Sequence, residues 1–268
     1  MAIPRRPGTR PSVARTGSEV VMRRRLPARD DPGVANDKVY IHEFVEIIGQ
    51  NRAAYMRHMT TGWGETGRRE RNMRCVGVWG TVGSTGPWPE TVNLWELDGW
   101  TGLAANFAHE LSNPDLQDPT LAAWWSKAAP LRRGGFDRLL VPAPYTPTID
   151  EACARGLGGA VYEHELVKLR PGAAREYLTR LEQEWLPLAE RIGLRLVGAW
   201  RTFYVDDDEA ICIWSIPSWD AWAEVCRAYE NDAGVRRWRE VVRDLVVGRH
   251  TKLLVDSPAN PLRTGRQP

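Results

Sequence analysis

The chain contains one pattern of residues twice, and this duplication limits the fold more than any other feature of the sequence. The segment V-Y-I-H-E-F-V begins at Val39, and V-Y-E-H-E-L-V begins at Val161, 122 positions later. The copies also share V-G-x-W segments that end at Trp79 and Trp200, an offset of 121. Small changes of offset are expected when insertions fall in loops between matching elements. The pattern therefore predicts two copies of one structural unit.

The length of the chain agrees with two units. With 268 residues, 43% of them hydrophobic, it can bury two cores of roughly 100 to 115 residues each. Each copy reads as strand, helix, hairpin, helix and strand, which is the ferredoxin-like split order. We predict an α+β fold with repeats over residues 38–142 and 160–258, a linker over 143–159 and a tail over 259–268. Two such units commonly pair their antiparallel sheets into a pseudo-symmetric α+β barrel.

The N-terminal segment differs from the rest in charge and composition. Residues 1–37 carry eight arginines against four acidic residues and are rich in proline, glycine and serine. Such a segment buries too little apolar surface to offset the entropy of ordering, so we predict an extended or disordered basic arm. The alternative is an arm that docks on a protein partner or a neighbouring subunit. The remainder is weakly acidic, which makes nucleic-acid binding unlikely.

Other features of the sequence point to a cytoplasmic protein that does not enter a membrane. No stretch approaches the roughly 18 to 20 apolar residues of a membrane helix, and the N-terminus lacks a secretory apolar segment. The four cysteines lie far apart, which is not the spacing of a metal ribbon or a redox C-x-x-C motif. We expect reduced thiols and no metal. The sequence also lacks the motifs of nucleotide-binding, P-loop, serine-hydrolase and zincin enzymes.

The second copy carries a series of strand and turn segments that point to a family. They are Val161-Tyr162-Glu163, Leu169-Arg170-Pro171-Gly172, Leu196-Val197-Gly198, Ile213-Trp214, Trp238 and Leu253-Leu254. Together they resemble the NIPSNAP family of the dimeric α+β barrel superfamily, and the resemblance extends over both copies. It implies a homo-oligomer with a cleft between two sheets that holds a small, mostly apolar molecule. Relatives include cofactor-free monooxygenases, isomerases, cyclases, lyases and haem enzymes, so the fold alone selects no reaction.

The two opening strands carry the first candidate site residues. Strand alternation puts His42 and Glu43, and likewise His164 and Glu165, on opposite faces, so only one kind of residue can enter the cleft. The resemblance favours the glutamates, although family members often have an arginine at the position of Glu165. A glutamate in an apolar pocket has a raised pKa and can transfer a proton. The alternative is a structural ion pair with an arginine such as Arg249.

Two roles are also possible for the histidines. A histidine in the cleft would act as a base, an oxyanion partner or an axial ligand, whereas a histidine beneath the helices would only be hydrogen-bonded. His250 has no counterpart in the first copy, where Phe136 stands, and an unmatched histidine is our strongest single candidate for catalysis.

Tryptophans supply the candidate binding residues. Six of the thirteen in the chain are predicted to surround the substrate: Trp79, Trp95, Trp200, Trp214, Trp63 and Trp88. Core packing is the alternative for most of them. The glycine-rich segment 60–69 is predicted to be non-helical, and together with the loop 83–89 it is the expected route of substrate access.

These features lead to three functional hypotheses. The first is a cofactor-independent isomerase, cyclase, lyase or monooxygenase that moves a proton on a small hydrophobic or aromatic metabolite in a tryptophan-lined barrel cleft. The second is a non-catalytic binding or assembly protein recruited through its basic arm. The third is a haem protein with His250 or His164 as the axial ligand.

Overall fold

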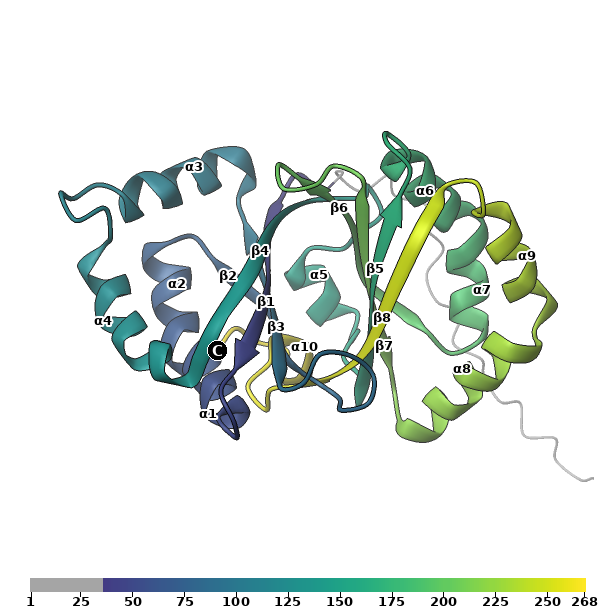
Figure 1. Cartoon of the computed structure of the whole chain (residues 1–268), viewed down its shortest axis with the longest axis horizontal. Helices are drawn as coiled ribbons and strands as arrows, with labels where there is room; N and C mark the ends of the chain where they lie inside the picture. Colours follow the sequence, from purple (N-terminus) through teal and green to yellow (C-terminus); the bar gives the residue numbers. More distant parts are fainter. Residues whose placement is uncertain (1–35) are drawn as a thin grey trace, which may run out of the picture. The chain divides into compact units, whose positions relative to one another are not determined.

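The computed structural model describes residues 36–268, and their strands form one closed barrel (Figure 1). The strands of the first repeat are β1 (Val39–Ile47), β2 (Arg74–Thr81), β3 (Glu90–Leu97) and β4 (Arg132–Pro142). Those of the second are β5 (Val161–Leu169), β6 (Arg195–Phe203), β7 (Glu209–Ile216) and β8 (Val246–Asp256). Their order around the barrel is β1-β3-β2-β8-β5-β7-β6-β4. Antiparallel pairing of β4 with β6 and of β2 with β8 joins the repeats, which confirms the predicted tandem α+β barrel.

The helices cover the outside of the barrel, those of the first repeat on one flank and those of the second on the other (Figure 1). The first repeat contributes α1 (Arg52–Arg57), the π-helical η1 (His58–Trp63), α2 (Gly64–Glu70), α3 (Gly99–Glu110), α4 (Pro119–Ala128) and the 3₁₀ turn η2 (Ala129–Leu131). The second contributes α6 (Ala174–Arg180), the π-helical η3 (Leu181–Trp185), α7 (Leu186–Arg191), α8 (Trp219–Asn231) and α9 (Ala233–Val241). Two short helices, α5 (Ile149–Ala154) and α10 (Pro261–Thr264), lie in the linker and the tail.

The prediction of a non-helical glycine-rich segment in the first repeat was wrong, because η1 and α2 cover it. Its glycines serve close packing. A Cβ on Gly67 would lie 2.9 Å from Nε1 of Trp63, and a Cβ on Gly64 would lie 2.7 Å from Cγ of Pro268. Both repeats place a π-helical turn that ends on a tryptophan, Trp63 and Trp185, at this point. The segment is therefore part of the helical layer, not a lid.

The repeated V-G-x-W segments have a steric explanation. In each segment the glycine and the tryptophan point to the same side of the strand, because they are two residues apart. The ring of Trp79 lies over Gly77, where a Cβ would be 2.1 Å from Cζ2, and Trp200 lies in the same way over Gly198. Only glycine leaves space for the indole, so the motif is a packing device of the barrel.

The barrel interior is filled by side chains from both repeats. Tyr40 of the first repeat meets Trp200 of the second edge to face at 5.4 Å, and Tyr162 meets Trp79 in the same way at 5.7 Å. All four side chains are at most 1% exposed. The interior is therefore a solid core in this region.

The linker and the tail close one end of the barrel. Thr148 and Glu151 form a capping box that starts α5, and reciprocal capping of this kind fixes where a short helix begins. Ile149 of α5 and Leu262 of α10 are buried in the interior cluster. The backbone amide of Ile149 donates to the buried carboxylate of Glu96 on β3 at 2.8 Å. These contacts tie the linker to the first repeat.

Three further predictions concern the chain as a whole. The basic arm lies almost entirely outside the described residues. Within residues 36–268 no helix combines the length and the apolar character needed to cross a bilayer. Each of the four cysteines is a free thiol.

Candidate functional site

The opening strands point their histidines into the barrel and their glutamates toward the helices, the reverse of the orientation that the family resemblance favours. The reason lies in the available partners. On the helical side, Nε1 of Trp95 donates to Glu43 at 3.1 Å, and Nε1 of Trp214 donates to Glu165 at 3.2 Å. Inside the barrel, the two histidines are hydrogen-bonded to each other. The glutamates are therefore candidates for chemistry in the helix–sheet layers.

His42 and His164 meet at the centre of the barrel. Their Nε2 atoms are 2.9 Å apart, and both side chains are fully buried. One imidazole must donate to the other, since two donors or two acceptors would repel. Burial, followed by the charges of nearby groups that include Arg138 and Lys252, holds the pKa of both imidazoles below its usual value, to about 3 for His164. Both rings are therefore neutral at physiological pH.

Two ion pairs flank the histidines and connect the repeats. Arg138 of β4 donates to Glu209 of β7 at 2.9 Å, and Lys252 of β8 pairs with Glu90 of β3 at 2.5 Å. Each pair takes its base from one repeat and its acid from the other. Between the two cations lies the ring of Phe44, 4.0 Å from Nζ of Lys252. This polar layer holds the halves of the barrel together.

His250 does not join this layer. Its side chain is exposed, and it stands opposite Leu166 in the register of β8 and β5. No cluster of three or more metal-binding side chains occurs in the described part of the chain, so neither His250 nor the central pair forms a metal centre with acidic or cysteine residues. The structure thus brings His42 and His164 together and leaves His250 apart from them.

The second repeat assembles a buried acidic cluster between its sheet and α8. Glu163 and Glu165 project from the same face of β5 and are 3% and 4% exposed. The hydroxyl of Tyr229 on α8 donates to Glu163 at 2.7 Å. Arg249 on β8 lies 3.5 Å from Glu165, the ion pair that the sequence had left as an alternative role. Two carboxyl groups of different environment therefore stand side by side.

The two carboxyl groups lie in different environments. Burial, followed by repulsion from Glu165, raises the pKa of Glu163 to about 8. Burial, followed by the charge of Glu163, also raises the pKa of Tyr229. Glu163 is thus a protonated acid at neutral pH, whereas Glu165 pairs with Arg249 and accepts from Nε1 of Trp214. Such divergence within one pair of acids is typical of acid–base sites, although structural ion networks produce it too.

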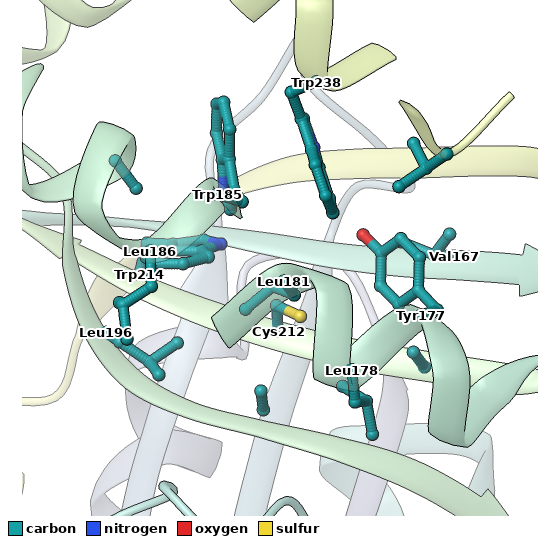
Figure 2. Close-up of a cluster of buried hydrophobic side chains, with 14 of the residues drawn as sticks. Val167, Tyr177, Leu178, Leu181, Trp185, Leu186, Leu196, Cys212, Trp214 and Trp238 are labelled. Atoms are coloured by element: carbon teal, nitrogen blue, oxygen red, sulfur yellow. The ribbon is translucent and has the colours of Figure 1, made fainter. Parts of the chain in front are cut away.

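Aromatic rings pack together in the helical layer of the second repeat (Figure 2). Trp185 and Trp238 stack at 5.7 Å with their planes 20° apart, and Trp185 stacks with Tyr229 at 6.3 Å. Trp214 stands edge-on to Trp185 at 6.5 Å. The acidic pair is therefore next to a wall of flat apolar surface.

The first repeat holds only part of this arrangement. Glu43 accepts from Nδ2 of Asn93 at 2.7 Å, and burial together with the charge of Asp137 raises its pKa to about 7. The position of Glu163 is occupied by Ile41, and that of Arg249 by Gly135. The complete set of acid, base and arginine thus belongs to the second repeat.

The prediction that tryptophans line an open barrel cleft was wrong. Four of the six, Trp79, Trp95, Trp200 and Trp214, are at most 1% exposed. Trp63 is buried in the helical layer of the first repeat, and Trp88 is 56% exposed on the hairpin loop. Two hollows of the described residues have volumes of about 250 and 280 Å³ and lie outside the barrel interior. All of these tryptophans except Trp88 are thus buried in the core.

Sequence reasoning missed Tyr229 as a functional residue and underrated Glu163. A signal for Glu163 was present, because the two copies differ there between Glu163 and Ile41. Tyr229 had no counterpart to mark it, since the helices that follow β3 and β7 differ in length and sequence between the repeats.

Comparison with known proteins supports the fold and the family resemblance. The model of the NIPSNAP family matches residues 162–260, which is the second repeat. A NIPSNAP family protein of unknown function from Agrobacterium tumefaciens shares 25% identity, with 39% of this chain and 94% of that chain covered and a TM-score of 0.35. Among curated proteins, none matches the sequence.

Several solved structures cover both repeats. An anthrone oxidase-like protein has 14% identity and a TM-score of 0.59, with 83% of this chain and 93% of that chain covered. A protein from Lactobacillus acidophilus, provisionally assigned as a monooxygenase, has 10% identity and a TM-score of 0.55, with coverages of 82% and 94%. Likeness at such identity establishes the fold alone. The second repeat thus matches the NIPSNAP family model over residues 162–260 and is set in a tandem α+β barrel.

Proposed function

We propose that the protein is a cofactor-independent enzyme that moves a proton on a small hydrophobic or aromatic molecule in the helix–sheet layer of its second repeat. The observation that carries this proposal is the buried pair of Glu163 and Glu165, one protonated and one held as a carboxylate by Arg249. A base and an acid in adjacent positions are what proton abstraction and return require. The fold neighbours described as a monooxygenase and an anthrone oxidase-like protein agree with a small-molecule enzyme.

Each group has a distinct role in this proposal. Glu165 is the base, because the charge of Arg249 and the indole N–H of Trp214 hold it ionised and fix its orientation. Glu163 is the acid that returns the proton, and Tyr229 connects it to the helical layer. The stacked rings of Trp185 and Trp238 favour a flat guest. Isomerisation, cyclisation and elimination all fit such a pair.

Access to the pair follows from the packing of α8. On this helix only Val225 is buried, while the other inward residues, among them Trp222, Cys226 and Tyr229, are half-buried. A helix with so little buried surface separates from the sheet at low cost. We therefore place substrate access beneath α8 instead of at the barrel mouth or the glycine-rich segment.

Exchange of carbon-bound hydrogen tests the proposal without knowledge of the natural substrate. 2-Tetralone, a small aromatic ketone with acidic α-hydrogens, is incubated with the protein in D₂O, and loss of the α-hydrogen signals is followed by NMR. We expect Glu165→Gln and Glu163→Gln to slow the catalysed exchange by about 100-fold or more. Glu224→Gln, a change on the exposed face of α8, should leave it unchanged. Equal rates in the wild type and both site variants would remove the proposed site.

A non-catalytic role is the second candidate, favoured by the solid barrel interior and by the position of the two hollows away from Glu163. In that case the basic arm recruits a protein partner, and the acids only anchor α8. Removal of residues 1–37 followed by size-exclusion chromatography tests this candidate. Loss of a homo-oligomer or of a partner complex on truncation, with no exchange activity in the full chain, supports the assembly role. A cytoplasmic location remains a prediction.

Haem binding fits the structure poorly. Nε2 of His164 is engaged with His42, and the exposed His250 borders neither hollow.

A further inference from the structure

A hollow of about 280 Å³ lies on the outside of the barrel, where the end of the first repeat meets the first helix of the second. One wall consists of Pro142 and Pro144 at the end of β4 and the start of the linker, and the other contains Leu178 of α6. The prolines make their wall rigid, because the pyrrolidine ring fixes the backbone dihedral. The hydroxyl of Tyr145 donates to the carbonyl oxygen of Leu178 at 2.9 Å, which holds the two walls together.

Two arginines border this hollow without ion partners among residues 36–268. Arg201 projects outward from β6, beside Val141 in the register with β4, and Arg175 comes from the first turn of α6. Burial, followed by the charge of Arg175, lowers the pKa of Arg201, so the two cations repel each other across the hollow. Two neighbouring guanidinium groups with free donors are suited to bind a carboxylate.

We propose that this hollow binds a small apolar or aromatic monocarboxylate, with the carboxylate between Arg175 and Arg201 and the apolar part against the prolines and Leu178. The volume sets the size, since 280 Å³ is near the lower limit of ligand pockets and admits a molecule about as large as benzoate. The apolar walls favour an organic acid over inorganic phosphate. Glu182 also borders the hollow. This site is separate from the acid–base pair and does not depend on its activity.

Titration of the full chain with benzoate, followed by calorimetry and by amide NMR, tests the proposal. We expect benzoate to bind more tightly than its neutral isostere benzamide and more tightly than inorganic phosphate. Arg201→Gln and Arg175→Gln should each weaken benzoate binding by about tenfold, because each removes a charged hydrogen-bond donor. Arg57→Gln on the exposed face of α1 should have no effect.

Three outcomes would overturn the proposal. Benzamide that binds as tightly as benzoate shows that the arginines do not select a charge. Phosphate that competes equally shows that the apolar walls contribute nothing. Unchanged benzoate affinity in both arginine variants places any binding elsewhere, and the amide shifts of the variants show that they remain folded.

Discussion

Replacement of Gly198 by alanine should destabilise the protein strongly, although the change adds one methyl group. The new Cβ would lie 2.3 Å from one ring carbon of Trp200 and 2.4 Å from a second, and 2.9 Å from Cγ2 of Thr146. Trp200 is 1% exposed and contacts Tyr40, so the indole has no free space in which to move. Overpacking of a filled core costs about 1 to 3 kcal/mol, and these contacts place Gly198→Ala near 3 kcal/mol.

Calorimetry measures this cost. For a unit of this size, about 3 kcal/mol corresponds to a fall in Tm of about 6 to 12 °C. Gly248→Ala is the matched control, since a Cβ there meets no atom within 4 Å. Its free energy of unfolding should change by less than about 0.5 kcal/mol.

A double-mutant cycle identifies the indole as the cause. In a Trp200→Leu background the ring is absent, so Gly198→Ala should cost little there, and the coupling energy should be about 3 kcal/mol. A Tm for Gly198→Ala equal to that of the wild type would refute the account of a solid interior. A cost that persists without the indole would refute the steric explanation of the V-G-x-W motif.

Three other changes test the barrel core. His42 and His164 have folded pKa values below the unfolded value of 6.5. Their contribution to stability is therefore present above pH 6.5 and is lost as the pH falls. Urea unfolding should show that replacement of both histidines by leucine removes about 2.5 kcal/mol of the stability that the wild type loses between pH 7 and 5.5. A double-mutant cycle on Arg138→Gln and Glu209→Gln should give a coupling energy of about 1 to 3 kcal/mol, and a value near zero would show that the ion pair does not hold the halves together. Removal of residues 259–268 should lower the free energy of unfolding by at least about 2 kcal/mol, because it removes the buried side chain of Leu262 from the interior cluster, and an unchanged Tm would contradict that role.

The sequence repeat predicted the fold because each repeated segment has the same structural role in both halves of the barrel. The matching V-G-x-W segments are placed by the same glycine–indole contact in both halves, at Gly77 and at Gly198. The glycine and the tryptophan of each contact are only two positions apart, so both partners can be recognised in the sequence. Element order and strand pairing within each half follow from them.

The orientation of the opening strands could not be read in the same way. A strand with one buried face alternates apolar and polar residues, but both faces of β1 and β5 are covered, one by the helices and one by the barrel. Tyr162 and His164 on one face and Val161 and Glu163 on the other carry similar mixtures of apolar and polar groups. The partners that decide the orientation, the indole of Trp214 and the opposite histidine, are distant in sequence.

The site in the second repeat was hidden for a related reason. Tyr229 reaches Glu163 from an element 66 positions away, and that contact exists only after α8 docks on the sheet. The glycines at positions 64 and 67 led to the wrong prediction of a non-helical segment. Their low helix propensity is overridden by the close approach of Pro268 and Trp63.

The protonation of Glu163 is the most direct test of the proposed acid–base pair. Its side-chain carboxyl carbon can be followed by ¹³C NMR through a pH titration of the full chain, with Glu163→Gln used to assign the signal. We predict a midpoint near pH 8 for Glu163, which lies beside the ion pair of Glu165 with Arg249. A midpoint near the ordinary value of 4.5 would show that both acids are ionised together, and the proposed division into acid and base would be wrong.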